Sequence, residues 1–181
     1  MNRQLLKAKI PLILNWIQQT LAAHAVKARP VASVNFSRLP HYFNPATLAA
    51  AKVVAVDVVP LPPLTALGLC QYADFEHMDA SGITYIDTFF VRDDLSDDER
   101  LHFHELVHVI QWSLLGPERF LAMYADGLER FGYRDSPLEA MAYRLDGHFQ
   151  QGAVPFSVEQ VVGIELRLPS VPATPFNPAK H

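Results

Sequence analysis

Three consecutive helices are indicated between residues 96 and 152, and they determine the class of fold. Ser96 and Glu99 have the spacing of a capping box, in which two side chains bond the unpaired N–H groups at a helix start. The helix that begins there is expected to run to Gly116, because a glycine followed by a proline ends a helical pattern.

Two further helices follow with boundaries of the same kind. Pro117 suits the first turn of a helix, and Gly132 suits its end. Ser136 and Glu139 repeat the capping-box spacing and predict a helix to about Gln151. The same signature at residues 157–160 predicts a short final helix.

Strand signals come earlier in the chain. Residues 53–59 are rich in β-branched side chains, and residues 83–91 are rich in Ile, Thr, Tyr, Phe and Val, so each segment predicts one strand. A short helix is expected at 45–51. These elements predict a single α+β domain over residues 1–168, mainly helical with a small β-sheet.

The two ends of the chain carry different signals. Apolar residues at helical spacing predict an amphipathic helix over about residues 3–28, begun or broken near Pro11. A secretory signal at residues 1–25 is the weaker interpretation, because its apolar run is short and contains Pro11 and Asn15. Four prolines predict an extended tail over 169–181. No run approaches the ~18 to 20 apolar residues of a membrane span, so we expect a cytoplasmic protein without a membrane partner.

Charge and cysteine content exclude two common kinds of partner and site. Fifteen basic and nineteen acidic residues give a net charge of -4, which supplies no electrostatic footprint for nucleic acid. The single cysteine, Cys70, cannot form an internal disulfide or a thiolate cluster, and we expect it to be buried. Eight histidines are present, so imidazole and carboxylate are the ligands available to a metal.

The segment His104-Glu105-Leu106-Val107-His108 is an H-E-x-x-H motif inside the first predicted helix. Residues four apart lie one turn apart on the same helix face, so both imidazoles can reach one ion. Glu105 lies about 100° further round the helix, where it can take a proton from a water and pass it to a leaving amine. Nitrogen and carboxylate ligands with one open position are typical of catalytic zinc.

A third protein ligand is needed, and the residues leave several candidates open. Gln111 and Leu114 stand where the extended motif of metzincins has Gly and His, which excludes that scheme. Glu139, 31 residues after His108, is the best candidate, although a helix-capping role competes for its carboxylate. Four rivals stay open: Glu118, Asp126, Glu129 and His148.

Residues 104–112 read HELVHVIQW, and residues 136–143 read SPLEAMAY. Together these segments resemble zincin-like bacterial proteins of unsettled function, whose signature is an H-E-L-x-H-x-x-Q helix followed by a Pro-x-Glu-x-x-Ala segment. The resemblance covers a metal-site core at about residues 82–150 and implies a zincin-like domain of the gluzincin type. It implies zinc held by His104, His108 and Glu139, with Glu105 as general base.

One position departs from the gluzincin pattern. Many gluzincins place an aspartate four residues after the ligand glutamate, where it orients a ligand histidine, whereas this chain has Tyr143. Asp146, one turn further on, is the expected substitute as hydrogen-bond acceptor.

The function expected from these residues is zinc-dependent hydrolysis of a peptide or protein substrate by a metal-activated water. Oxyanion stabilisation needs a donor, and Tyr124, Tyr133 and Tyr143 are available, with Tyr143 as the working catalytic candidate. The strand before the motif helix has the right place to be an edge strand to which a peptide adds, or else it is an ordinary core strand. The alternative function is a non-catalytic zinc-binding or protein-interaction module. No oligomeric state is specified by these patterns.

Other side chains near the motif are expected to have structural roles. Gln111 shares a helix face with both motif histidines and is expected to hydrogen-bond near the metal or to occupy a polar spot. His102 is expected to be solvated. Trp112, Leu115 and Phe120 are expected to belong to the core rather than to a substrate pocket.

Overall fold

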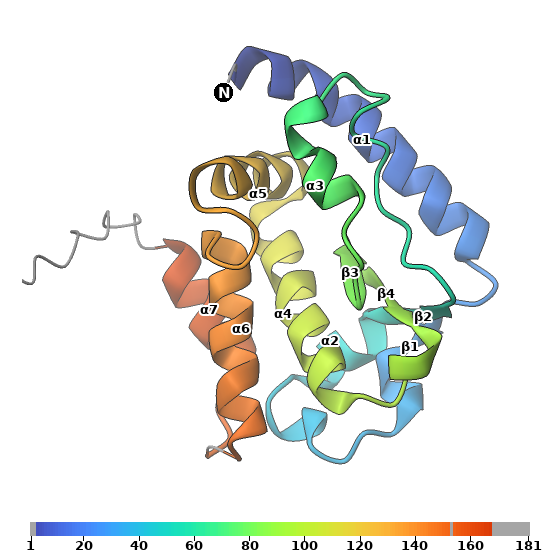
Figure 1. Cartoon of the computed structure of the whole chain (residues 1–181). Helices are drawn as coiled ribbons and strands as arrows, with labels where there is room; N and C mark the ends of the chain where they lie inside the picture. Colours follow the sequence, from blue (N-terminus) through green and yellow to red (C-terminus); the bar gives the residue numbers. More distant parts are fainter. Residues whose placement is uncertain (1–2, 153, 168–181) are drawn as a thin grey trace, which may run out of the picture.

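The computed structural model describes residues 3–152 and 154–167 and has a mainly helical α+β architecture (Figure 1). Its helices and strands in chain order are α1 (Arg3–His24), β1 (Arg29–Pro30), α2 (Pro45–Ala50), β2 (Lys52–Val56), α3 (Ala73–Glu76), β3 (Gly82–Tyr85), β4 (Thr88–Arg92), α4 (Glu99–Leu115), α5 (Pro117–Phe131), α6 (Pro137–Gln150) and α7 (Val158–Arg167). Helix α4 lies at the centre, with the strands on one side and α6 and α7 on the other.

Four strands form one mixed sheet in the order β1-β2-β4-β3. Strands β2 and β4 pair in parallel, with Val54 opposite Phe90, while β1 pairs with β2 and β3 pairs with β4 in antiparallel fashion. Among the described residues β3 pairs with β4 only, so β3 is an edge strand of the sheet.

Side chains of the two central strands alternate between two hydrophobic layers. Val53 and Phe89 pack into the layer that includes α2, α4 and α6, whereas Val54 and Phe90 pack into the layer that includes α1 and α5. All four are buried, because successive strand residues point to opposite faces and both faces are covered. The sheet therefore holds β3 beside the motif helix, and Trp112 of α4 also reaches the layer that contains α1.

Helix α1 is continuous through Pro11 and ends at His24, so the expected break is wrong and the expected end at residue 28 is too late. It buries Ile13 and Ile17 in the second hydrophobic layer and packs beside α5. No helix in the described part of the chain is long and apolar enough to cross a membrane.

The segment 83–91, predicted as one strand, is a hairpin instead. Ile86 and Asp87 form the turn between β3 and β4, and Ile86 has a φ of 62°. A β-branched residue rarely adopts a positive φ, so nothing in this apolar run marks the turn. Strand β2 ends at Val56, so the predicted strand at 53–59 is too long.

The N-cap of α4 lies two residues after the predicted capping residue. Asp98 is the N-cap instead of Ser96, and its carboxylate accepts the N–H of Arg100 at 2.9 Å. Glu99 does not close a capping box, because its Oε1 accepts the backbone N–H groups of residues 38 and 39. The predicted helix is confirmed, but Ser96 is not its N-cap and Glu99 does not form the expected capping box.

Later boundaries agree with the sequence more closely. Gly116 and Gly132 terminate α4 and α5, and α2 covers the short helix expected at 45–51. The final helix α7 has ten residues, with the Gln160 N–H donating to Ser157 Oγ in its first turn. The predicted tail at 169–181 lies outside the described residues.

Candidate metal centre

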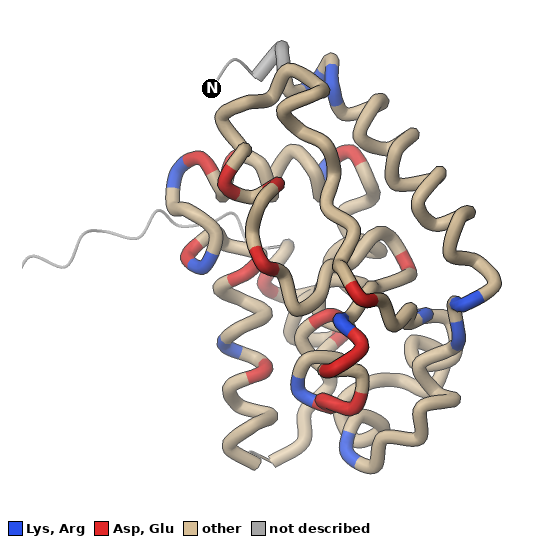
Figure 2. The backbone as a smooth tube through the Cα atoms, turned by 45° about the vertical axis from the view of Figure 1, so that its right-hand side comes forward, with Lys and Arg blue, Asp and Glu red and all other residues tan. Residues whose placement is uncertain are grey.

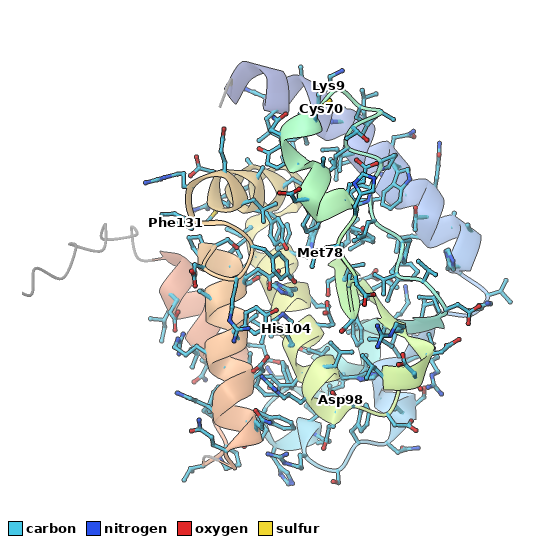
Figure 3. All side chains as sticks on the ribbon, viewed as in Figure 1. Lys9, Cys70, Met78, Asp98, His104 and Phe131 are labelled. Carbon is cyan, nitrogen blue, oxygen red and sulfur yellow. The ribbon has the colours of Figure 1, made fainter. Side chains whose placement is uncertain are left out.

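His104, His108 and Glu139 come together in the buried interface between α4 and α6. The two Nε2 atoms are 3.2 Å apart, Glu139 Oε2 is 3.3 Å from His104 Nε2, and Glu139 Oε1 is 3.4 Å from His108 Nε2. His104 is labelled in Figure 3, between the ribbons of α4 and α6. Ligands at ~2.0–2.2 Å from a tetrahedral zinc ion are about 3.3 Å from one another. The three side chains are therefore spaced as zinc ligands are.

Hydrogen bonds on the far side of each imidazole determine which nitrogen faces the cluster. His104 Nδ1 lies 2.9 Å from Asp146 Oδ2, and His108 Nδ1 lies 2.8 Å from Gln111 Oε1. Both partners are acceptors, so each Nδ1 carries a proton and each Nε2 of a neutral ring presents a lone pair. Two lone pairs facing each other require a cation between them, either a proton or a metal ion.

Asp146 and Gln111 are themselves held in place. The Arg100 guanidinium donates to Asp146 Oδ1 at 2.8 Å, and Gln111 Nε2 donates to the Leu138 carbonyl at 3.0 Å. The expected contact between Asp146 and a ligand histidine is confirmed, as is the expected hydrogen bond of Gln111 beside the cluster. Partners of this kind orient metal-binding histidines and raise their basicity.

Glu139 serves the cluster and does not cap α6. Ser136 is the N-cap residue, but its side chain makes no capping hydrogen bond. Glu139 Oε1 accepts the Tyr124 hydroxyl at 2.7 Å, while Oε2 is buried without a hydrogen-bond partner among the described residues. A buried carboxylate oxygen without a donor is costly, and a cation bound by the imidazoles would satisfy it. The residues present therefore fit a zinc ion.

No family model, curated protein or solved structure matches this chain.

The rival third ligands, Glu118, Asp126, Glu129 and His148, do not join the cluster.

Glu105 is buried beside the cluster and is held by strand β3. Its Oε2 accepts the Thr84 hydroxyl at 2.7 Å, and Thr84 Oγ also donates to the Glu105 carbonyl at 3.1 Å. Gly82 lies against the same carboxylate, because a Cβ at this position would be 2.6 Å from Glu105 Oε1. Sequence reasoning missed Thr84 and Gly82, although their spacing of two residues places them on one face of a strand.

Charges within the cluster shift several pKa values. Burial lowers the pKa of His104, but the hydrogen bond to Asp146 and the nearby negative charges of Glu139 and Glu105 outweigh it and raise that pKa to about 10. Burial also lowers the pKa of His108, but the negative charge of Glu139 has the larger effect, so the pKa of His108 is raised. Burial raises the pKa of Glu139, but His108 and His104 together hold it well below its usual range. Without a metal, the histidines therefore hold protons that an ion must displace.

Burial raises the pKa of Glu105, and the neighbouring charges of His104 and His108 offset part of this rise. A carboxylate with a raised pKa is a stronger base than an exposed one, so the position suits proton transfer near neutral pH.

The three tyrosines have different relations to the cluster. The Tyr124 hydroxyl is occupied by Glu139. The Tyr143 ring lies 4.7 Å from the His104 ring between centroids, and its hydroxyl shares a hydrogen bond with Tyr133. Tyr133 contributes to the walls of both cavities that adjoin the cluster. Tyr133 and Tyr143 therefore remain candidates for oxyanion stabilisation.

Two cavities meet at Glu105. One is polar, measures about 270 Å³, and has His104, Arg100 and Asp146 in its wall. The other is almost entirely apolar, measures about 90 Å³, and reaches His108 and Glu139. Figure 2 shows acidic residues gathered at the start of α4, next to the polar cavity, while Lys and Arg are scattered over the chain.

Two expectations about individual residues need correction. His102 is fully buried rather than solvated, because its ring packs edge-on against Phe89 of the sheet. Cys70 is exposed rather than buried. Trp112 and Phe120 belong to the core as expected, but both also line the apolar cavity.

Proposed function

We propose that the protein is a zinc-dependent metallopeptidase with a zincin-like domain of the gluzincin type. The observation that carries this proposal is the convergence of two imidazole Nε2 atoms and a donor-free carboxylate oxygen of Glu139 at separations of 3.2–3.4 Å. The second carboxylate, Glu105, lies beside them and takes no part in the ligand set.

The residues divide into ligands and a base. Zinc held by His104, His108 and Glu139 supplies a Lewis acid that polarises a carbonyl and lowers the pKa of water. Glu105 accepts the proton of the attacking water and delivers it to the leaving amine. The Thr84 hydroxyl holds one oxygen of Glu105, so the carboxylate is fixed before a substrate arrives.

The sheet supports an extended peptide as the substrate. Strand β3 is an edge strand, and it runs directly past Glu105 through Gly82 and Thr84. An edge strand offers backbone N–H and C=O groups to a chain that adds alongside it. A peptide bound there has its scissile bond close to the base and the ligand cluster.

Two variants test this proposal. Wild type and Glu105→Gln are expected to bind one zinc per chain by elemental analysis, whereas His104→Ala is expected to bind none. Cleavage of a peptide library is expected in zinc-loaded wild type only, with a loss of about 10²- to 10⁴-fold in Glu105→Gln. Glu118→Gln, on the exposed surface of α5, is the matched control and is expected to behave as wild type.

A non-catalytic zinc module is the second candidate, and the near-complete burial of the ligands and of Glu105 favours it. Zinc at one per chain without cleavage of any library peptide would support this module. Cleavage retained in purified Glu105→Gln would contradict the role of Glu105 as base.

A further inference from the structure

We propose that the apolar cavity beside the cluster is a specificity pocket for an uncharged aliphatic side chain, of about valine to leucine size, next to the scissile bond. This inference rests on the proposed peptidase function and names its substrate class. Part of the pocket wall comes from α1 and residues 61–80, which lie outside the segment that carries the metal motif.

The cavity is continuous with the reacting groups. Its wall includes Glu105, His108 and Glu139, and it shares Gly82 and Tyr133 with the polar cavity. A peptide lying along β3 passes this shared boundary at Gly82, directly beside the Glu105 carboxylate. One substrate side chain can therefore enter the apolar cavity while the peptide backbone stays in the polar one.

The lining selects against charge. Apart from the cluster and its base, the described lining residues have apolar or uncharged side chains. They come from α1, residues 61–80, β3, α4, α5 and Tyr133, and examples are Ile17, Leu64, Trp112, Phe120 and Ala125. An ammonium or guanidinium group placed among them loses its hydration and gains no ion pair.

The volume sets an upper limit on size. At about 90 Å³ the cavity is smaller than the ~150 Å³ cavity that admits benzene in a well-studied engineered protein. A branched aliphatic side chain fits this space, whereas a phenyl or indole ring requires the walls to move. Met78, labelled in Figure 3 near the start of β3, lies at the boundary between the two cavities.

Hydroxamates that carry different organic side chains test the pocket without turnover, because the hydroxamate group itself chelates zinc. Zinc-loaded protein is titrated with acetohydroxamate, isocaproyl hydroxamate and aminocaproyl hydroxamate. The branched aliphatic chain is expected to bind about 10- to 100-fold more tightly than acetohydroxamate, and the charged chain is expected to gain little.

Two variants of α5 localise the effect. Ala125→Leu fills the cavity and is expected to reduce the gain of the aliphatic chain to about threefold or less. Ala122→Leu, one turn earlier, faces a separate surface groove beside α1 and is expected to keep the full gain. Acetohydroxamate is expected to bind all three proteins equally.

If acetohydroxamate and the aliphatic hydroxamate bound wild type with equal affinity, the proposed pocket would be wrong, but the proposed zinc site would not be affected by this result. Failure to load zinc would instead overturn the proposed function, and xenon then tests the pocket in metal-free protein. Xenon enters dry apolar cavities, so shifts of the Met78 methyl resonance that disappear in Ala125→Leu support the pocket. No xenon response in wild type overturns it.

Discussion

Each ligand of the cluster has one partner behind it that determines how it faces the others. Asp146 and Gln111 hold the protonated Nδ1 atoms of the two histidines, and Tyr124 holds one oxygen of Glu139. Three different side-chain types thus perform one task, which is to leave a lone pair aimed at the centre. The cluster is consequently preorganised before a cation binds.

Asp146→Asn is expected to weaken zinc binding about 10- to 100-fold, because an amide is a poorer acceptor for His104 Nδ1–H and lowers the basicity of that ring. Competition with a zinc-binding dye measures the affinity. Asp87→Asn, at a surface ion pair with Lys52, is the matched control. Equal affinity in Asp146→Asn and wild type would show that the contact does not tune the ligand.

Zinc binding is expected to release protons, and the apparent affinity for zinc is expected to increase with pH. The His104 ring has a pKa of about 10 in the metal-free protein, above its unfolded value near ~6.5, so at neutral pH the ion competes with a bound proton. The competition weakens as the pH rises toward that pKa. Calorimetry in buffers of different ionisation enthalpy measures the proton count; a pH-independent affinity between pH 6 and 9 contradicts this account.

Individual residues were predictable where local spacing defines chemistry. The two histidines and Glu105 follow from helical periodicity, and the contact of Asp146 follows from its distance along α6. Thr84 and Gly82 were missed because they meet Glu105 only through the packing of β3 on α4. His102 was wrongly predicted to be solvated, because the sheet covers the face of α4 on which it lies.

At the level of elements, β3 and α4 together position Glu105, the proposed base. Gly82 permits β3 to approach Glu105 closely. A Cβ at this position would lie 2.6 Å from Glu105 Oε1 and 3.1 Å from the Phe90 carbonyl oxygen. The close approach of β3 to α4 therefore requires a residue without a side chain at position 82.

Gly82→Ala is expected to displace the Glu105 carboxylate and to reduce hydrolysis at least about tenfold, with zinc content unchanged. Peptide cleavage and elemental analysis on the same sample measure the two effects. Gly147→Ala on α6 is the control, because nothing lies within 4 Å of its added Cβ and alanine favours a helix by up to about 1 kcal/mol. Full activity in Gly82→Ala would mean that Glu105 has room to adjust.

Helices were predicted more accurately than strands, for a physical reason. Gly116, Pro117 and Gly132 act locally through backbone conformation, so they mark helix ends in any context. The hairpin turn at Ile86 has no glycine or proline to mark it, and it depends on the pairing of β3 with β4 and on the Lys52 N–H that donates to the Asp87 carbonyl at 2.8 Å.

For the whole molecule, a metal bound by the cluster would cross-link α4 and α6. A ligand that binds only the folded state adds RT ln(1 + [L]/Kd), about 2.7 kcal/mol at a hundredfold excess over Kd. The same free energy corresponds to a rise in Tm of about 5–10 °C for a domain of this size. Metal binding is thus expected to contribute a sizeable part of the stability.

Thermal unfolding with added zinc and with a chelator measures this contribution. Wild type is expected to show the rise and to lose it on chelation, while His104→Ala is expected to show no zinc response. His77→Ala, at an exposed position, serves as control and is expected to follow wild type. A Tm that is insensitive to zinc in wild type would exclude a folded-state metal site.

The parallel pairing of β2 with β4 has a consequence for the order in which the protein assembles. Lys52 meets Thr88 only after the chain between them, including β3, has closed into a loop, and such non-local contacts form slowly. Helices α4, α5 and α6 follow one another directly and can dock early. The β3–β4 hairpin precedes α4 directly, so Thr84 and Glu105, like the three residues of the cluster, can meet before β2 completes the sheet.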